Sequence, residues 1–414
     1  MNGENDVCSA HLCGNTDEIL KFTGEFMDAK NDGMVVITRE RNHGIDLLRI
    51  VSMFMVVMLH VLGQGGILAR AVNLTWNGEI WWSIEILCYC AVNVYALISG
   101  YVGLKSRHKY SNLINLCIQL TFYAVIIGST EAIVLACKGE EILFEEIIFH
   151  FFPSIRSMWY FQAYFCLFFF MPLLNAIIEN VPRKILCACG WLVLIVFCCS
   201  GIWSSHVAHL GSGYSVLWLS ILYAVGAYMN KYDTLKNISI SYSLLGYFMC
   251  IFATVLSRSI IGTYDSSRIN LFVSYISPTI VMSAVFLLSA FSKMKFGKKS
   301  TVAISYISPL SFGVYLIHCH PYIFNMIRGH FAWIADKPMY YALFIVVGVA
   351  MAIFVGCLII EMLRYWLFKV CKIKEFCVWL ENSIAKIVSK SKNVQNSDMP
   401  LKSEEGVASD KTDV

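Results

Sequence analysis

The stretch that decides the fold is GIDLLRIVSMFMVVMLHVLGQGG, residues 44–66. It is long and apolar enough for a membrane-spanning helix, which needs about 20 such residues, yet it carries Arg49 and His60. A separation of eleven residues, at about 100° per residue, puts both on one helix face, about 16 Å apart along the axis. Ionisable groups inside a span usually face a cavity or a partner and mark function.

The composition of the whole chain is that of a membrane protein. Of its 414 residues, 57% are hydrophobic and only 14% are charged, and the mean hydropathy is +0.63. Soluble domains carry about 25% charged residues, so the sequence predicts several spans surrounded by membrane lipid. The formal net charge of +4 is too small to indicate a nucleic-acid partner.

Ten apolar runs are candidate spans, so we predict an all-α fold: a polytopic membrane helix bundle of about ten transmembrane helices. The runs cover residues 45–64, 80–104, 112–137, 158–179, 185–204, 215–230, 240–262, 269–291, 304–326 and 340–367. Residues 140–152 (EEILFEEIIFHFF) are apolar on one side and acidic on the other. That pattern favours an interfacial helix over a span.

The distribution of Lys and Arg predicts the orientation, because cytoplasmic loops carry an excess of them. With the N-terminus inside, the cytoplasmic loops hold eleven: Lys105, Arg107, Lys109, Arg183, Lys184, Lys231, Lys236, Lys293, Lys295, Lys298 and Lys299. The outer loops hold six: Arg70, Lys138, Arg156, Arg268, Arg328 and Lys337. Both termini are therefore predicted to be cytoplasmic.

The chain divides into three predicted parts. A polar cytoplasmic segment, residues 1–40, precedes a ten-span membrane domain, residues 41–370, and a cytoplasmic tail, residues 371–414, follows. From about residue 381 the tail is rich in Ser, Lys and Glu and nearly free of aromatic residues, so we expect it to be largely disordered beyond its first helical turn or two. The chemistry is expected in the bundle or its short loops.

The sixteen cysteines do not predict a disulfide scaffold or a metal site. Most of them lie inside apolar runs, where a free cysteine behaves as a small hydrophobe. Cys8, His11 and Cys13 resemble part of a metal site, but the fourth ligand of a structural zinc site is missing. No metal is therefore expected.

Two pairs of charged residues near the cytoplasmic ends of spans are spaced for local ion pairs. Arg49 follows Asp46 by three residues, and Arg364 follows Glu361 by three. For Glu361 an ion pair is a better interpretation than catalysis. Arg49 either anchors the helix end as a snorkelling side chain or faces a cavity and binds a phosphorylated or anionic ligand.

His60 lies too deep in its helix to reach the cytoplasmic surface. A neutral histidine there can be satisfied by a hydrogen bond to another helix. Alternatively, a solvated histidine can take a proton from a hydroxyl and pass it on. Lys105 and Arg107 also have two interpretations: ordinary cytoplasmic charge, or a basic collar with Arg49 that binds phosphates.

Other polar and aromatic residues inside the spans are second-rank candidates for substrate contacts. Trp159 and Tyr160 are expected at the outer interface, where aromatic belts form. His318 should lie at a depth comparable to that of His60. The full second-rank set is Asn93, Trp159, Tyr160, Tyr164, Tyr315 and His318.

Together these residues resemble the acyltransferase 3 family of membrane O-acyltransferases. The opening RNHGIDLLR (41–49) is followed by ten residues and then a histidine, which matches the family's first-span pattern of a basic residue and a histidine at Arg49 and His60. Later matches follow in order along residues 41–370: Ser99 and Gly100 with Lys105 and Arg107; Trp159, Tyr160, Tyr164, Pro172 and Asn175; and Ser311, Gly313, Tyr315 and His318.

The resemblance implies transfer of an acyl group, usually acetyl, from cytoplasmic acyl-CoA to a hydroxyl of a surface glycan or lipid-linked sugar in the bacterial cell membrane. It also implies about ten spans and an essential first-span histidine. The segment before residue 41 is longer than the family's usual lead, and no hydrolase-like domain follows the bundle.

A mechanism can be stated on this basis. Acetyl-CoA would dock its phosphates at Arg49, Lys105 and Arg107, and His60 would act as general base on the acceptor hydroxyl. Direct transfer and a transient acyl-histidine both fit. The rival functions are a glycan or lipid-intermediate transporter or flippase, and a membrane scaffold or sensor whose polar groups serve only packing. The acyl chain, the acceptor sugar and the oligomeric state stay open.

Overall fold

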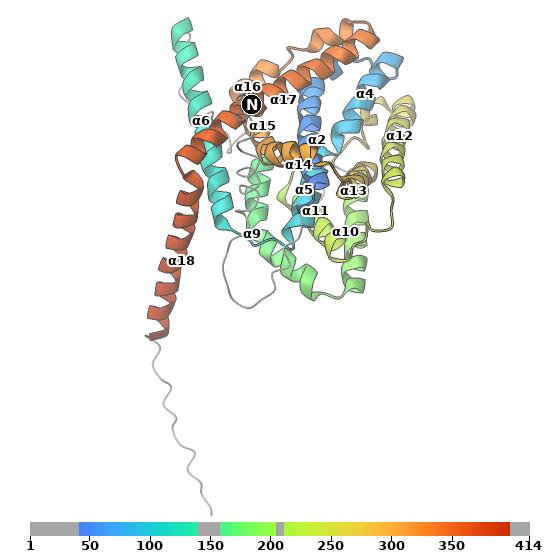
Figure 1. Ribbon diagram of the computed structural model, residues 1–414. Coiled ribbons are helices and arrows are strands. Elements are labelled where there is room, and N and C mark those ends of the chain that lie inside the picture. The colour runs from blue at the N-terminus through green and yellow to red at the C-terminus, as the bar shows by residue number, and fades with distance from the viewer. Residues whose placement is uncertain (1–40, 140–157, 204–210, 398–414) are drawn as a thin grey trace, which may run out of the picture. The chain divides into compact units, whose positions relative to one another are not determined.

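The computed structural model describes residues 41–139, 158–203 and 211–397, and within these ranges the regular structure is entirely helical (Figure 1). The chain from His43 onward forms one compact unit. The predicted N-terminal segment with Cys8, His11 and Cys13, and the predicted interfacial helix 140–152, lie outside the described residues.

The first half of the chain builds the helices α2 (His43–Leu59), α3 (Ile67–Arg70), α4 (Trp76–Tyr89), α5 (Ala91–Gly103), α6 (Tyr110–Lys138), α9 (Trp159–Asn180) and α10 (Arg183–Trp203). The second half builds α11 (Val216–Lys231), α12 (Ile240–Tyr264), α13 (Pro278–Ser292), α14 (Lys298–Ile307), α15 (Ser311–His318), α16 (Pro321–Ile327), α17 (Met339–Val370) and α18 (Ile373–Ser397). Short turns are η1 (His60–Gln64), η3 (Gly211–Gly213), η4 (Ser266–Arg268), η5 (Ser308–Leu310) and η6 (Ala332–Asp336).

Seven helical segments among the described residues are long and apolar enough to cross a membrane, so the chain is a multi-pass membrane protein. They are His43–Gln64, Trp76–Gly103, Tyr110–Lys138, Trp159–Asn180, Ile240–Tyr264, Lys298–His318 and Met339–Val370. The other three predicted spans coincide with α10, α11 and α13, and α11 and α13 have only 16 and 15 residues. The count of ten spans stays a prediction.

Two of the predicted spans are wrong in their continuity. Residues 269–277 were expected to be helical, but α13 begins only at Pro278. Proline is favoured in the first turn of a helix because its missing N–H is not needed there, so it fixes this late start. The predicted span 304–326 is divided at 319–320, where α15 ends and Pro321 starts α16.

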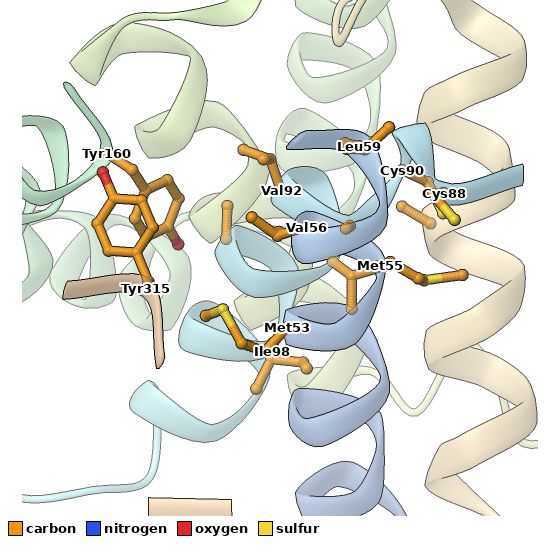
Figure 2. Close-up of a cluster of buried hydrophobic side chains, with 14 of the residues drawn as sticks. Met53, Met55, Val56, Leu59, Cys88, Cys90, Val92, Ile98, Tyr160 and Tyr315 are labelled. Atoms are coloured by element: carbon orange, nitrogen blue, oxygen red, sulfur yellow. The ribbon is translucent and has the colours of Figure 1, made fainter. Parts of the chain in front are cut away.

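Helix α2 lies at the centre of the bundle and packs against α4, α5, α13, α15 and α17. Figure 2 shows its buried side chains pointing to different sides of the helix, among them Met53, Met55 and Val56, with Val92 of α5 nearby. All four are at most 7% exposed. An apolar surface that wraps around α2 in this way explains why its sequence is apolar on nearly every side.

The serine and glycine of the second span allow α5 and α11 to pack closely. A Cβ atom on Gly100 would lie 1.8 Å from the backbone oxygen of Tyr223, and one on Gly226 would lie 2.1 Å from that of Leu97. Ser99 donates to the backbone oxygen of Tyr95 within its own helix, at 2.8 Å. The close contact of α5 and α11 therefore leaves no room for a side chain at Gly100, and small residues at such a contact are typical of membrane helices.

The C-terminal tail is helical further than the sequence suggested. We expected disorder beyond a turn or two from residue 381, but α18 continues to Ser397. Its Glu381 carboxylate accepts from the backbone N–H groups of Tyr110 (2.9 Å) and Ser111 (3.1 Å), and so caps the first turn of α6. Partial burial raises the pKa of Glu381, but these hydrogen bonds outweigh it and the pKa is lowered. This cap and the buried Cys377 tie α18 to the bundle.

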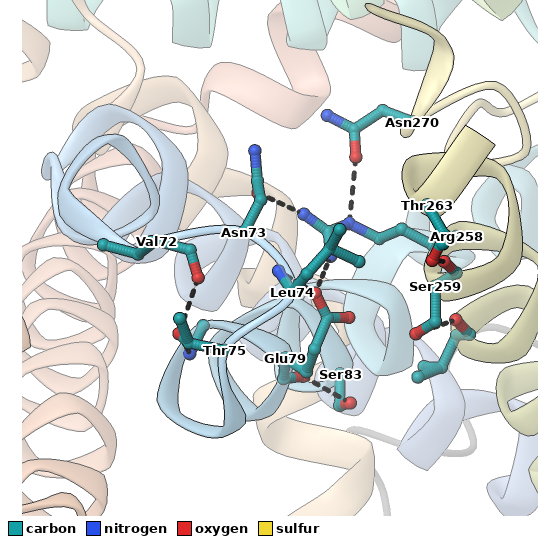
Figure 3. Close-up of polar contacts among 12 residues, drawn as sticks. Val72, Asn73, Leu74, Thr75, Glu79, Ser83, Arg258, Ser259, Thr263 and Asn270 are labelled. Atoms are coloured by element: carbon teal, nitrogen blue, oxygen red, sulfur yellow. Dashed lines mark hydrogen bonds and ion pairs between the residues drawn. The ribbon is translucent and has the colours of Figure 1, made fainter. Parts of the chain in front are cut away.

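In the C-terminal half of α12, a buried arginine that sequence analysis passed over joins three segments. Figure 3 shows the Arg258 guanidinium between Asn270, Asn73 and the Glu79 carboxylate of α4. It also lies 4.3 Å from the centre of the Trp82 ring, a cation–π distance. Arg258 is 1% exposed, and a buried charge needs such partners.

Candidate active site

His60 begins a π-helical turn, η1, that forms the last turn of the first span. The backbone N–H of Gly65 donates to the His60 oxygen five residues earlier, at 2.8 Å. The loop after α16 holds the end of this turn, because Gly329 donates to the Gln64 oxygen at 2.8 Å and Phe331 to the Gly65 oxygen at 2.9 Å. Single π turns inside α-helices are frequent at functional sites.

The His60 ring meets the ring of His318 at the end of α15. His60 Nδ1 lies 2.9 Å from His318 Nε2, and His318 Nδ1 lies 2.6 Å from the backbone oxygen of Val314. The two histidines are thus at the same depth, as the sequence predicted. The Phe324 ring packs edge-on to His60, with centroids 5.2 Å apart.

This chain of hydrogen bonds assigns the protons of both rings. A carbonyl oxygen only accepts, so His318 Nδ1 carries a proton, and in a neutral ring the other nitrogen, Nε2, then has a lone pair. That lone pair accepts from His60 Nδ1, which therefore carries the proton of the His60 ring. The Nε2 atom of His60 is left with its own lone pair, ready to accept a proton.

A cysteine that sequence analysis treated as packing completes the cluster. The Sγ atom of Cys319 lies 3.5 Å from His318 Nε2 and 3.7 Å from His60 Nδ1. Cys319 is 8% exposed and His318 is fully buried. The only sequence signal was its position directly after His318, which is uninformative until His60 is known to lie opposite.

In the first half of α2, Arg49 forms the predicted local ion pair. Its guanidinium donates to Asp46 at 2.9 Å, and the side chain stays 29% exposed. Its backbone oxygen accepts from the Tyr95 hydroxyl of α5, at 2.7 Å. Lys105 and Arg107 are exposed in the loop that follows α5.

Aromatic rings extend from Tyr95, beside Arg49, to the histidine pair. The Tyr160 ring lies 6.3 Å from Tyr95, 6.4 Å from Tyr164 and 6.1 Å from Tyr315, measured between centroids. Tyr315 in turn lies 6.4 Å from His318. Tyr160 and Tyr315 face each other in Figure 2. Four of the second-rank candidates, Tyr160, Tyr164, Tyr315 and His318, are thus joined by a series of ring contacts between α9 and α15.

A second run of rings begins at Trp159, the first residue of α9. Its ring centroid lies 4.6 Å from that of Tyr214, which lies 5.0 Å from Tyr275, and Tyr275 lies 4.8 Å from Tyr89. Tyr275 belongs to the non-helical segment 269–277. Tyr214 is 48% exposed and Tyr275 only 6%, so the run leads from the surface into the bundle.

Asn93, a second-rank candidate, is already engaged in bracing these elements. Its Nδ2 donates to the Tyr275 oxygen at 2.8 Å, and its Oδ1 accepts from Trp218 Nε1 at 3.1 Å. The side chain is fully buried. The geometry therefore gives Asn93 a role in holding α5, α11 and the 269–277 segment together.

Glu85 on α4 is a buried acid that sequence analysis did not single out. It is 7% exposed, and its Oε2 atom has no hydrogen-bond partner among the described residues. Its Oε1 atom lies 4.0 Å from the place of a Cβ atom on Gly63, in the π turn that starts at His60. Tyr89 follows Glu85 by one helical turn and lies on the same face.

Four interruptions of helix surround this region: the π turn, the junction of α4 and α5 at Cys90, the segment 269–277 and the break at 319–320. Non-helical backbone at membrane depth is tolerated only where protein buries it or where it lines a cavity. Interrupted spans are also a common way to build polar sites within a bundle. The part of the bundle around His60 therefore has the interrupted backbone that is typical of a polar site.

Glu361 fulfils the structural role that was predicted. Its carboxylate pairs with Arg364, three residues on, and also accepts from Gln119 Nε2 at 3.0 Å and from the Tyr123 hydroxyl. It is fully buried, so it joins α17 to α6.

Comparison with known families gives one match. The model of an acyltransferase domain matches residues 42–361, most of the chain, including both histidines and the aromatic residues of α9 and α15. No curated protein and no solved structure matches the chain. An acyltransferase domain of this extent, in a multi-pass helical protein with the motif residues described above, identifies the chain as a member of the acyltransferase 3 family.

Proposed function

We propose that the protein is an integral-membrane O-acyltransferase in the bacterial cell membrane, with both termini in the cytoplasm. It moves an acyl group, acetyl by default, from cytoplasmic acyl-CoA to a hydroxyl of a surface polysaccharide or lipid-linked sugar. The observation that carries the proposal is the chain from the Val314 oxygen through His318 to His60, since it leaves the Nε2 lone pair of His60 available as a general base.

The proposed reaction at His60 transfers one proton and needs no acid or base besides His60. Nε2 takes the proton of the acceptor hydroxyl as the oxygen attacks the thioester carbon, and the sulfur of CoA leaves as thiolate. The imidazolium then returns this proton to the thiolate. His318 accepts from Nδ1 throughout and so stabilises the positive charge. General base catalysis of this kind contributes about 10²–10⁴ in rate.

The donor is expected from the cytoplasmic side. Lys105 and Arg107 are exposed and Arg49 is partly exposed, which suits them to the phosphate groups of CoA. The pantetheine arm would cover the distance of about 16 Å from Arg49 to His60, beside the rings of Tyr160 and Tyr315. Arg49→Ala should raise the KM for acyl-CoA and leave kcat nearly unchanged; a wild-type KM would remove Arg49 from donor binding.

The acceptor is expected from the opposite side. The rings from Trp159 to Tyr89 offer faces on which the apolar side of a sugar can stack, and the open oxygen of Glu85 can accept from sugar hydroxyls. Glu85→Gln should therefore raise the KM for the acceptor while the KM for acyl-CoA stays as in the wild type. If both constants stay unchanged, Glu85 has no part in acceptor binding.

The test is acyl transfer by purified protein, with a panel of acyl-CoA donors and of sugar or lipid-linked sugar acceptors. His60→Ala should lower transfer by about 10²–10⁴-fold, with an unchanged elution profile and helix content. His330→Ala, in the exposed loop after α16, is the matched control and should retain activity. Retained activity in His60→Ala would refute the mechanism. Absence of transfer by the wild type with every acceptor would favour transport of a glycan intermediate.

A further inference from the structure

We propose that a thiophilic cation, with Zn²⁺ as its representative, binds to His60 Nδ1, His318 Nε2 and Cys319 Sγ, and that it inhibits the protein rather than serving as its cofactor. Of the clusters of His, Cys, Asp and Glu in the described residues, this one has three ligand atoms close enough to share an ion. Each residue contributes one atom, from α15, the break after it and the π turn.

The separations of the ligand atoms fit a tetrahedral ion. With Zn–S near 2.3 Å and Zn–N near 2.0–2.1 Å, a tetrahedral site places sulfur and nitrogen about 3.6 Å apart and two nitrogens about 3.3 Å apart. The observed S–N distances are 3.5 and 3.7 Å. The N–N distance of 2.9 Å is that of a hydrogen bond, so replacing its proton with an ion requires the rings to part by only a few tenths of an ångström.

The surroundings of the ligands are also those of a metal site. Histidines that bind metals usually donate their other N–H to a carbonyl or carboxylate, which fixes the ring and its tautomer. His318 donates to the Val314 oxygen in this way, at 2.6 Å, and directs its Nε2 lone pair toward the other two ligands. Two imidazoles and a thiolate favour zinc or copper(I) over magnesium or calcium, and three protein ligands leave a fourth position open.

Binding changes the protons of the site in a defined way. The Cys319 thiol loses its proton to solvent, because only the thiolate binds the ion. The proton on His60 Nδ1 moves to Nε2, so His60 stays neutral, and one proton is released for each ion bound. The lone pair that would accept the substrate proton is then lost. This inhibition rests on the proposed function, whereas binding of the ion does not.

The experiment measures zinc bound and cobalt absorption in full-length protein that carries Cys8→Ser and Cys13→Ser, so that these N-terminal thiols do not contribute. Cys319→Ser is the test variant, and Cys377→Ser, which removes an equally buried thiol from α18, is the matched control. We expect the parent and Cys377→Ser to bind one more zinc ion per chain than Cys319→Ser does. Cobalt should give a thiolate-to-metal absorption band in the first two proteins alone.

Zinc inhibition of acyl transfer is the second readout, measured against the zinc-free rate of each protein. The inhibition constant should rise by at least about tenfold in Cys319→Ser, since loss of even an outer ligand contact costs about 10–100-fold in affinity. Equal zinc content in all three proteins, or no cobalt–thiolate band in the parent, would overturn the proposal even if Cys319→Ser failed to fold. Zinc bound as expected in a protein without transferase activity would leave the site in place and refute only the proposed function.

Discussion

Replacement of His318 tests whether His60 works as a base through the hydrogen bond that it donates. His318→Ala removes the acceptor of the His60 Nδ1 proton, at 2.9 Å, in a region where His318 is fully buried. A buried donor without a partner costs about 1–3 kcal/mol. That cost falls on the tautomer with its lone pair on Nε2, so the ring shifts toward the tautomer that cannot accept the substrate proton.

The free energy converts directly into a rate. Each 1.36 kcal/mol corresponds to a factor of ten, so kcat should fall by about five- to 150-fold. This is less than the loss of about 10²–10⁴-fold expected when the base itself is removed in His60→Ala. His318→Gln offers a carbonyl oxygen as substitute acceptor and should recover much of the loss.

The assay is steady-state acyl transfer with equal amounts of folded wild type, His318→Ala and His318→Gln. The KM for acyl-CoA should stay within about twofold of the wild-type value, because His318 acts on the base and not on the donor. A wild-type kcat in His318→Ala would refute the reasoning. So would an equal loss in both variants, because the identity of the acceptor would then be irrelevant.

Three further predictions concern stability and docking. Gly100→Ala should destabilise the fold by about 1–3 kcal/mol, since its Cβ atom would overlap the Tyr223 oxygen. The control is Gly348→Ala, whose Cβ atom would meet nothing within 4 Å. Equal thermal unfolding temperatures of the two variants would contradict the packing argument. Arg258→Ala should cost about 3 kcal/mol, the lower end for a broken buried pair, because Glu79 stays 19% exposed; an unchanged unfolding temperature would show that the network is dispensable. The pKa of Glu381 is lowered in the folded protein, so its cap on α6 is fully present above the ordinary carboxyl pKa and is lost as the pH falls through the lower folded value. Hydrogen exchange in α18, corrected for its intrinsic pH dependence, should therefore rise only below about pH 4.5. Glu381→Gln should show this faster exchange already at pH 7. Exchange as slow as in the wild type would show that the Glu381 cap is not what holds α18 against α6.

The helical class, and the need of His60 for a partner inside the bundle, could be predicted from the sequence because both depend on local patterns. Long apolar runs indicate segments that can be buried in lipid, and each predicted span overlaps at least one helix, although the spans 269–291 and 304–326 are helical only in part. A histidine too deep to reach the cytoplasmic surface needs a partner, and His318 could be placed at its depth by counting residues. Equal depth did not predict the hydrogen bond between His60 and His318, because the faces that α2 and α15 turn toward each other depend on tertiary packing and not on either segment alone.

The remaining features depend on residues far apart in the chain. Hydropathy is the same for a helix and for a buried irregular segment, so residues 269–277 looked like part of a span. The helix of α18 forms where its own composition argues against it, because Glu381 caps a helix that begins 271 residues earlier. Arg258 was passed over for the same reason: Asn73 and Glu79 stand more than 170 positions before it.

The π turn at His60 has a consequence for how the chain tolerates length changes. A π turn accommodates about one more residue than the α-helical turn that it replaces, so it is an insertion absorbed within a helix. Deleting Leu62 would let the turn relax to an α-helical turn, and the segment beyond it would keep its orientation relative to α2, because the π turn already absorbs that residue. Gln64 and Gly65 would then still meet the loop at Gly329 and Phe331. The first span should therefore tolerate the loss of one residue after His60 better than the loss of one residue within α2, where a deletion rotates the rest of the helix by about 100°.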